Sequence, residues 1–297
     1  MPSHRRTGVA VLGAGLIGLD LLDKIRCSPR LECRLVAGRN RQTLGLKRAA
    51  DLGYPTTDGG ITALTEAIDG HGIDVVFDAS NADSHAEHWR HLEPTNALLV
   101  DLTPSDLGVP IVPTVNGADT LTERHIGLIS CGGQSAIPIL HAIARHRTPR
   151  YVEVVSTGAS RSAGRATRLN LDEYIHTTQQ AARHFTGAPT AKVLVNISPA
   201  TVPPPFRVTL TCLVDAPQPE TIRSLVAAAA HRVQRFVPGY ALTALEAEAD
   251  RVTATVEVTA TGRRIPRHAG NLEIINAAAI QAAEMHAGTH QSEGARS

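Results

Sequence analysis

Cys131 is the residue whose surroundings best suit covalent chemistry. It stands in Ile129-Ser-Cys131-Gly-Gly-Gln134, between a predicted strand and a predicted helix. The start of that helix should point at the sulfur, lower the pKa of the thiol and favour the thiolate. The two glycines leave room for a substrate and free backbone N–H groups for a developing oxyanion. We expect Cys131 to be a nucleophile, and we interpret Cys27, Cys33 and Cys212 as small buried hydrophobes.

A glycine-rich turn follows the first predicted strand, residues 8–12, and opens a predicted helix over 15–27. In this context Gly13 suits a tight turn, Gly15 lets the backbone approach a pyrophosphate, and Gly18 lets the helix pack on the strand. The N–H groups of the helix start would hold the phosphates. The alternative is a glycine turn in a non-binding α/β domain. The predicted dinucleotide-binding turn comprises Gly13, Ala14, Gly15, Leu16, Ile17 and Gly18.

The end of the second predicted strand indicates which dinucleotide is bound. An NAD site usually places Asp or Glu there to accept from the ribose 2′-hydroxyl. Here the chain reads Ala37-Gly-Arg39-Asn-Arg41 and has no carboxylate. Arg39 and Arg41 suit a 2′-phosphate, so the sequence favours NADP, or tolerance of NAD and NADP, over two solvated arginines. Ser80 and Asn81 follow the third strand and are expected to line the cofactor crevice.

A thiolate beside a nicotinamide suggests one kind of reaction. It adds to an aldehyde to give a thiohemiacetal, hydride leaves to the cofactor, and a thioester remains.

The fourteen histidines do not add a metal site to this interpretation. His85, His88 and His91 have helical spacing among charged neighbours, so we expect a solvated helix face rather than metal ligands. We also expect no catalytic role for His268.

The elements that position these residues predict an α/β protein of two domains. Strands alternate with helices up to residue 131, which is typical of a Rossmann-type, doubly wound parallel sheet. Four long strands rich in Val and Thr follow, near 151–157, 191–197, 206–214 and 251–259, and they suggest a mixed or antiparallel sheet. We expect the helix near 271–287 to return to the first domain. The predicted domains are 1–131 with 271–297, which binds dinucleotide, and 132–270, which carries catalysis and dimerisation.

Composition excludes several other classes of protein. The 297 residues have a net charge of +1 and only 3% aromatic residues, which argues against a nucleic-acid partner. No apolar stretch is long enough to span a bilayer, and no secretory signal precedes the first strand, so we expect no membrane partner. The four cysteines lack metal-type spacing, and a reduced, cytoplasmic protein is expected.

Several blocks of the chain, in order, resemble the short acylating, CoA-dependent acetaldehyde dehydrogenases, and the resemblance covers nearly the whole length. It implies a second domain like that of glyceraldehyde-phosphate dehydrogenase, a homodimer, an aldehyde or acyl-CoA substrate and coenzyme A as cosubstrate. It also implies a 4-hydroxy-2-oxovalerate aldolase partner in aromatic hydrocarbon catabolism. The blocks are Gly13-Ala-Gly-Leu-Ile-Gly-Leu-Asp-Leu-Leu22, Asp101-Leu-Thr-Pro104, Cys131-Gly-Gly-Gln-Ser-Ala-Ile-Pro138, Ser162-Ala-Gly164, Thr167-Arg168, Asn170-Leu-Asp-Glu173 and Ala269-Gly-Asn-Leu-Glu-Ile274.

The resemblance also implies roles for individual residues. Cys131 would be the acyl-thioester nucleophile. A segment before the 170–185 helix, with Asn271, would contact the nicotinamide end of the cofactor. These residues are Ser162, Ala163, Gly164, Arg165, Ala166, Thr167, Arg168, Leu169, Asn170 and Asn271.

The chain departs from the family pattern at two positions. The family has an acidic residue after the arginine of the strand that follows the proline turn, and this chain has Val208; the acid expected at the end of the second strand is replaced by Asn40. The changes suggest a diverged member with a different aldehyde, a different cofactor, or mainly the direction that reduces acyl-CoA. The alternatives are an acyl-phosphate reductase of the same fold, which normally needs a histidine beside the cysteine, and a catalytically idle nucleotide-binding subunit of an aldolase complex.

Overall fold

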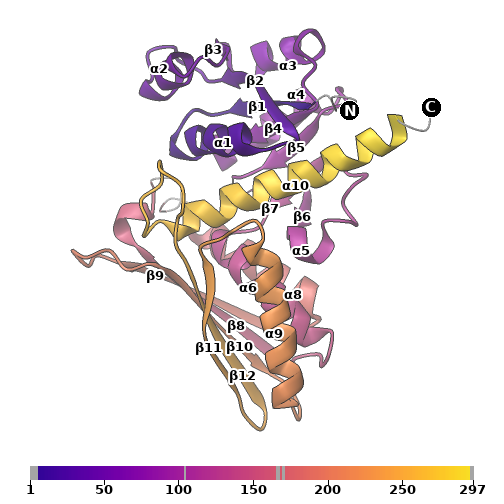
Figure 1. Ribbon diagram of the computed structural model, residues 1–297, viewed down its shortest axis with the longest axis vertical. Coiled ribbons are helices and arrows are strands. Elements are labelled where there is room, and N and C mark those ends of the chain that lie inside the picture. The colour runs from indigo at the N-terminus through magenta and orange to yellow at the C-terminus, as the bar shows by residue number, and fades with distance from the viewer. Residues whose placement is uncertain (1–5, 104, 165–167, 169–170, 295–297) are drawn as a thin grey trace. The chain divides into compact units, whose positions relative to one another are not determined.

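The computed structural model describes residues 6–103, 105–164, 168 and 171–294. The chain divides into two compact units, residues 1–128 with 278–297 and residues 129–277 (Figure 1). Helix α10 (Gly270–Gly294) begins in the second unit and ends in the first. None of the described helices is both long and apolar enough to cross a lipid bilayer.

The first unit is built on a seven-stranded sheet in the order β3-β2-β1-β4-β5-β7-β6, and every pairing in it is parallel. Every residue of β4, β5 and β7 is buried, as expected for a parallel sheet covered on both faces. The strands are β1 (Thr7–Leu12), β2 (Leu31–Ala37), β3 (Thr56–Thr57), β4 (Val75–Asp78), β5 (Leu98–Asp101), β6 (Val109–Ile111) and β7 (His125–Leu128). The helices are α1 (Leu16–Cys27), α2 (Leu44–Asp51), α3 (Gly60–His71), α4 (Ala82–Leu92) and α5 (Pro113–Asn116). The doubly wound sheet predicted from the alternation of strands and helices is confirmed.

The second unit is built on a five-stranded mixed sheet in the order β11-β12-β10-β8-β9. The β8–β9 pair is parallel and the other pairs are antiparallel. Its strands are β8 (Tyr151–Ala159), β9 (Thr190–Ser198), β10 (Phe206–Leu213), β11 (Tyr240–Ala247) and β12 (Arg251–Val258). Its helices are α6 (Cys131–Ala144), the 3-10 turn η1 (Ser160–Ser162), α8 (Leu171–Thr186) and α9 (Pro219–Gln234).

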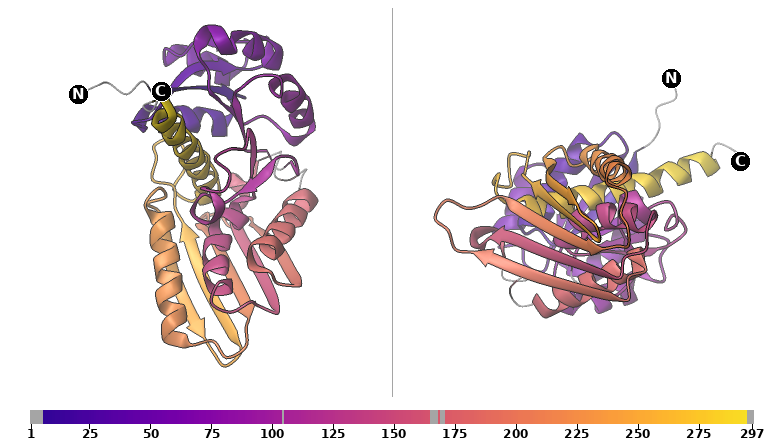
Figure 2. Two further views of the ribbon diagram at one scale, coloured as in Figure 1. Left: turned by 90° about the vertical axis from the view of Figure 1, so that its right-hand side faces the viewer. Right: turned by 90° about the horizontal axis from the view of Figure 1, so that it is seen from below.

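Residues along β8, β10 and β12 alternate between buried and more exposed, which places a single apolar face against the helices. Helices α6, α8 and α9 lie on that face, as two views of the unit show (Figures 1 and 2). The core between them includes Leu140, Val154, Leu210 and Val226, all fully buried. The mixed sheet predicted for this half of the chain is confirmed.

Two local differences from the sequence prediction have physical causes. Helix α2 begins at Leu44 rather than Arg39, because the Asn40 side chain accepts the Gln42 backbone N–H at 2.8 Å and forms a turn. Strand β11 was not predicted, because its Ala, Leu and Glu residues favour helix in isolation. Its pairing with β12 supplies the strand conformation.

Candidate active site

The glycine-rich turn between β1 and α1 has the backbone that its sequence predicts. Gly13 adopts a φ of +103°, a conformation that L side chains rarely adopt, and its N–H donates to the Ala37 carbonyl at 2.8 Å. A Cβ at Gly18 would overlap the Gly13 carbonyl oxygen, so the first turn of α1 packs against the loop as expected. The N-cap position of α1 is Gly15, which has no side chain to cap the helix, and a helix start of this kind carries a partial positive charge that suits an anion.

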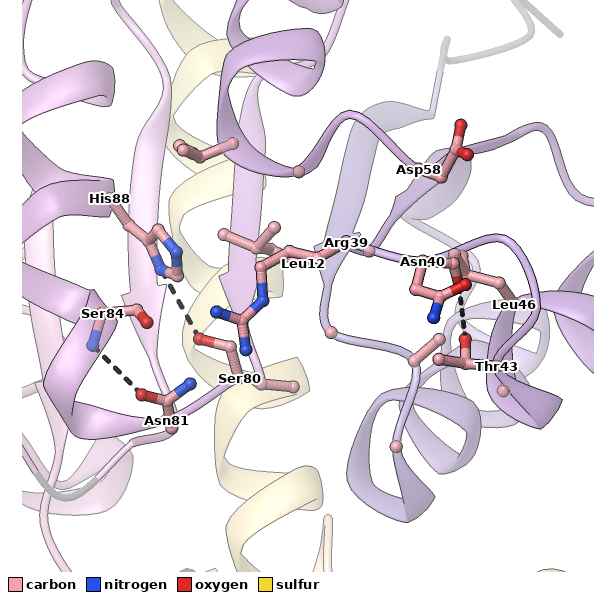
Figure 3. Close-up of a pocket in the computed structure, with 18 of the residues that line it drawn as sticks. Leu12, Arg39, Asn40, Thr43, Leu46, Asp58, Ser80, Asn81, Ser84 and His88 are labelled. Carbon is pink, nitrogen blue, oxygen red and sulfur yellow. Dashed lines mark hydrogen bonds between the residues drawn. The ribbon is translucent and has the colours of Figure 1, made fainter.

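A cavity of about 830 Å³ lies beside this turn, within the first unit (Figure 3). Gly13, Ala14 and Gly15 line it, and a Cβ built on Gly15 would find no described atom within 4 Å. The other three residues of the turn, Leu16, Ile17 and Gly18, belong to the helix and are not among the lining residues. The opening above Gly15 is the space that a pyrophosphate needs to approach the backbone.

Arg39 lines the cavity and Arg41 does not. Figure 3 shows the Arg39 guanidinium pointing toward the side where Ser80 and His88 lie, and all three residues line the same space. Arg41 instead lies 3.7 Å from the Asp58 carboxylate, in an exposed ion pair. The structure therefore separates the two arginines that the sequence treated alike.

The predicted crevice residues Ser80 and Asn81 also line the cavity, and the Asn81 side chain accepts from Ser84 N at 3.1 Å, which caps α4. Sequence reasoning missed Gly45, where a Cβ would overlap the Ala14 carbonyl oxygen. A glycine inside a helical pattern was the available signal for this close approach. Lining residues that the sequence did not single out include Thr43, Asp58, Gly59, Gly60, Thr62, Ser84 and Glu87. His88, which was expected on a solvated helix face, lines the cavity as well.

A buried network of carboxylates and imidazoles lies directly behind Ser80. The Asp78 Oδ2 atom is 2.8 Å from His85 Nδ1 and 2.7 Å from His88 Nδ1, and its Oδ1 accepts from Ser80 Oγ. His85 Nε2 lies 2.8 Å from His125 Nε2 and 3.4 Å from Asp101. The predicted solvated face is therefore wrong for His85 and His88, which are 0% and 6% exposed, whereas His91 is half-buried.

The same three side chains, Asp78, His85 and His88, are close enough to be considered for a metal ion. Tetrahedral ligands at about 2.1 Å from zinc lie roughly 3.4 Å apart. Contacts of 2.7 and 2.8 Å are instead ordinary hydrogen bonds from two imidazoles to one carboxylate oxygen. The geometry fits a hydrogen-bonded network better than a metal centre.

The pKa values of the titratable groups in this network are shifted in different directions. Burial alone would raise the pKa of Asp78, but hydrogen bonds from His85, His88 and Ser80 hold that pKa well below its usual range. For His85, burial opposes the charge, yet the Asp78 hydrogen bond and the Asp101 charge raise its pKa. Burial raises the pKa of Asp101 to about 7, and burial together with the nearby His85 charge lowers the pKa of His125 to about 4.

Cys131 is the first residue of α6 in the second unit, where hydroxyl groups surround it. The Tyr174 hydroxyl lies 3.5 Å from the Cys131 Sγ and accepts the Gly132 N–H at 2.9 Å. Ser130 Oγ accepts the Gly133 N–H at 2.9 Å and caps the helix. The prediction that these two N–H groups are free for an oxyanion is therefore wrong, because each already has a hydroxyl partner.

The prediction of a lowered thiol pKa at Cys131 is also wrong. Burial raises the pKa of this thiol to about 11, although the hydrogen bonds with Tyr174 and with the Gly132 N–H oppose the increase. Desolvation of the sulfur therefore outweighs the helix terminus.

The four cysteines are all unpaired, and they differ in burial. Burial raises the pKa of Cys33 and of Cys212 to about 12, which suits inert thiols. Cys27 is exposed, so its interpretation as a buried residue is wrong.

Val208, which stands where the family pattern has an acid, is 0% exposed in the core of the second unit. It pairs with Ser156 of the neighbouring strand, and paired residues present their side chains to the same face of a sheet. Ser156 Oγ lies 3.2 Å from the Tyr174 hydroxyl. The polar groups on this side of Cys131 are thus hydroxyls.

The predicted nicotinamide segment is described in part. Asn271 Nδ2 donates to the Ser162 carbonyl at 3.2 Å, while its buried Oδ1 has no partner among the described residues. Arg168 folds back on its own loop and donates to the Ala163 and Ser160 carbonyls at 3.2 and 2.9 Å. A Cβ at Gly164 would meet no atom of the described residues within 4 Å. Five of the predicted residues lie outside the described residues: Arg165, Ala166, Thr167, Leu169 and Asn170.

A doubly wound dinucleotide-type sheet and a mixed-sheet unit whose first helix begins at a cysteine define the two-domain fold of glyceraldehyde-phosphate-dehydrogenase-like oxidoreductases. A crystal structure of aspartate semialdehyde dehydrogenase II from Vibrio cholerae has this fold, with a TM-score of 0.66. The two sequences are 14% identical, and the matched region covers 95% of this chain and 98% of the Vibrio cholerae chain.

Sequence relatives narrow this class to one family. Residues 131–266 match the family model "Prokaryotic acetaldehyde dehydrogenase, dimerisation". An acetaldehyde dehydrogenase of Streptomyces griseus is 48% identical over 94% of this chain and 90% of its own length. An acetaldehyde dehydrogenase of Pectobacterium atrosepticum is 43% identical over 95% of this chain and 96% of its own length. Acetaldehyde dehydrogenase 1 of Comamonas testosteroni is 39% identical over 96% of this chain and 94% of its own length. The chain belongs to the acetaldehyde dehydrogenase family.

Proposed function

We propose that this protein is an acylating aldehyde dehydrogenase that interconverts a short aldehyde, acetaldehyde or a homologue, and its acyl-CoA. The reaction is aldehyde + CoA + NAD(P)+ ⇌ acyl-CoA + NAD(P)H + H+. The observation that carries the proposal is the position of Cys131 at the start of α6, with its sulfur in hydrogen-bond contact with Tyr174. Its thiolate adds to the aldehyde carbon and forms a thiohemiacetal. Loss of hydride from that carbon leaves a thioester, and attack by the CoA thiolate frees Cys131 and releases acyl-CoA.

A nicotinamide dinucleotide is the cofactor that the family and fold imply, and it supplies the hydride acceptor or donor. The residues of the first unit fit it. The cavity beside the turn is about 830 Å³, and the space above Gly15 is open to a phosphate. In the second unit, the Asn271 Oδ1 has no partner among the described residues, and it fits an N–H donor such as the carboxamide of a nicotinamide.

NADP is the dinucleotide that we propose, through Arg39. The guanidinium of Arg39 is exposed and lines the cavity, and no acidic residue stands at 38–41 to accept from a ribose 2′-hydroxyl. Asp58 also lines this cavity, but its carboxylate is already paired with Arg41.

Coenzyme A is favoured over phosphate as the acyl acceptor. A phosphate-exchanging dehydrogenase of this fold normally places a histidine beside the cysteine. In the described part of the second unit, the side chain that bonds to the Cys131 sulfur is a tyrosine. Val208 provides no carboxylate to take a proton from the thiohemiacetal. The same group would return that proton in the reverse reaction, so its absence should slow aldehyde oxidation and acyl-CoA reduction alike.

We propose a homodimer formed through the second unit. The matched family model describes dimerisation, and α6, α8 and α9 occupy one face of the sheet (Figure 2). The other face carries Thr209 and Thr255, in contact at 3.1 Å, and the Arg207–Glu257 ion pair. We also propose a cytoplasmic enzyme, since its four cysteines are unpaired, and a 4-hydroxy-2-oxovalerate aldolase as partner.

Turnover with defined substrates tests the proposed activity. We would measure NADH and NADPH oxidation with acetyl-CoA and propionyl-CoA, and dinucleotide reduction with the matching aldehydes and CoA, in the wild type and in Cys131→Ser. Loss of CoA-dependent turnover in the serine variant is the expected result. Full turnover in that variant, or turnover that depends on phosphate instead of CoA, contradicts the proposal.

A further inference from the structure

The Tyr174 hydroxyl makes several contacts and has one proton to donate. Its oxygen accepts the Gly132 N–H at 2.9 Å. Its own proton can go to Ser156 Oγ at 3.2 Å or to Cys131 Sγ at 3.5 Å, and the Ser130 hydroxyl also interacts with it. The Tyr174 side chain is only 7% exposed, so its hydroxyl is held among these groups.

None of the described side chains in contact with the Tyr174 hydroxyl carries a formal charge when the Cys131 thiol is neutral. Helix α8 contributes Tyr174, β8 contributes Ser156, and β10 contributes the apolar Val208 opposite Ser156. The Gly132 position matters as well, because a Cβ there would overlap both the Ser156 and the Tyr174 hydroxyl oxygens.

We infer that Tyr174 donates the hydrogen bond that positions the Cys131 sulfur and stabilises its thiolate, while Ser156 competes for the same proton when the thiol is neutral. The inference rests on the proposed role of Cys131 and adds the residue that makes the sulfur reactive. Ionisation of the thiol pulls the Tyr174 O–H from Ser156 to the sulfur, because charge-assisted hydrogen bonds are the stronger ones.

The ionisation behaviour of the two groups agrees with a donor rather than a base. Burial, with the neighbouring Cys131 charge, raises the pKa of Tyr174 far above its usual range, so the phenol keeps its proton. Burial also raises the pKa of Cys131, and the Tyr174 hydrogen bond works in the opposite direction. A buried thiolate without this donor would form still less readily.

The test is the rate at which iodoacetamide alkylates each cysteine between pH 7 and 9, followed by peptide mass spectrometry on the full chain. Three variants are compared with the wild type: Tyr174→Phe, Ser156→Ala and the control Tyr240→Phe. Tyr240 is equally buried in the second unit and donates to the Ser135 carbonyl at 2.8 Å, away from the sulfur. The exposed Cys27 reports the reagent's activity in every sample.

The two variants at the site should move the Cys131 rate in opposite directions. Tyr174→Phe should slow Cys131 alkylation about tenfold, which corresponds to a thiol pKa about one unit higher. Ser156→Ala should accelerate it about twofold or more, because the freed hydroxyl turns to the sulfur. Tyr240→Phe should leave the Cys131 rate within about twofold of the wild type.

Two results overturn the inference: a wild-type Cys131 rate in Tyr174→Phe, or a slowed rate in Ser156→Ala. The serine variant decides the matter if the phenylalanine variant does not fold. Alkylation requires no substrate turnover, so this result is independent of the Cys131→Ser assay. A protein in which Tyr174 controls the thiol but which lacks CoA-dependent turnover would refute the proposed activity alone.

Discussion

Val208 of β10 lies directly opposite Ser156 of β8, on the same face of the second sheet. Ser156 reaches the Tyr174 hydroxyl, whereas Val208 is fully buried and carries no polar group. Hydroxyls therefore occupy the neighbourhood in which the family pattern expects a carboxylate. A hydroxyl stabilises a thiolate by donation but does not take up a proton at neutral pH, so the site supports the cysteine as a hydrogen-bond donor and not as a general base.

Gly132 should tolerate no side chain. A Cβ at this position would overlap the Ser156 and Tyr174 hydroxyl oxygens, so Gly132→Ala must displace both of them or move the backbone. We expect CoA-dependent turnover to fall at least about 100-fold, because displacement by an ångström in an active site has that order of cost. The control is Gly70→Ala, where a Cβ meets open space in α3. Wild-type turnover in Gly132→Ala would mean that the hydroxyl arrangement is irrelevant to catalysis.

Arg39 should select the dinucleotide. Replacing it with alanine removes the guanidinium that lines the cavity, and the KM for NADPH should rise about tenfold or more while the KM for NADH changes little. Arg41→Ala is the matched control, because that guanidinium is exposed and pairs with Asp58. Steady-state kinetics with both reduced dinucleotides provide the measurement. An equal rise in the KM for NADPH and the KM for NADH would refute a role of Arg39 in recognising the 2′-phosphate.

Asp101 should make the stability of the protein depend on pH. Burial raises its pKa to about 7, so the folded state keeps a proton that the unfolded chain loses near pH 4. Its contribution to stability is therefore complete below about pH 4 and is lost as the pH rises toward 7.

Asp101→Asn removes that titration. Relative to the wild type, the asparagine variant should gain more than about 1 kcal/mol of unfolding free energy between pH 4.5 and pH 7.5, whatever its offset at either pH. Urea unfolding at the two pH values measures this difference, and Asp119→Asn serves as an exposed control. A difference between wild type and variant that stays constant with pH would show that Asp101 is ionised throughout.

His85 should also make the stability of the protein fall as the pH rises. The Asp78 hydrogen bond and the Asp101 charge raise its pKa against the effect of burial, so its favourable charge is present below about pH 6.5. That contribution is lost as the pH rises through the elevated pKa. In NMR spectra recorded between pH 5 and 9, the midpoint of the His85 ring titration should lie above the value of about 6.5 of an unperturbed imidazole. A midpoint below that value would contradict the assignment of charge within the network.

Local patterns allowed the sequence to predict the glycine-rich turn between β1 and α1. The glycine spacing, the apolar run before it and the helical run after it all lie within 8–27, so the β1–α1 turn followed from adjacent residues. The strand-to-helix junction at Cys131 followed in the same way, and α6 begins at this residue.

Contacts between distant residues account for most of what the sequence did not predict. His85 and His88 have the spacing of a surface helix, but Asp78 comes from the end of β4, and His125 and Asp101 come from β7 and β5. Tyr174 lies 43 residues after Cys131 and reaches it only because α8 packs against α6. The helix start predicted a thiol with a lowered pKa. That prediction was wrong because the residues that desolvate the sulfur could not be identified from the sequence.

The central claim is that Cys131 carries the acyl group as a thioester. The most direct measurement mixes the protein with acetyl-CoA, without dinucleotide, and maps the acetylated peptide by mass spectrometry after a rapid acid quench. We expect acetyl on Cys131 in the wild type, a lower yield in Tyr174→Phe at pH 8, and none on Cys27, Cys33 or Cys212. An enzyme that turns over acetyl-CoA while Cys131 remains unmodified, or while another cysteine is acetylated, would contradict the account.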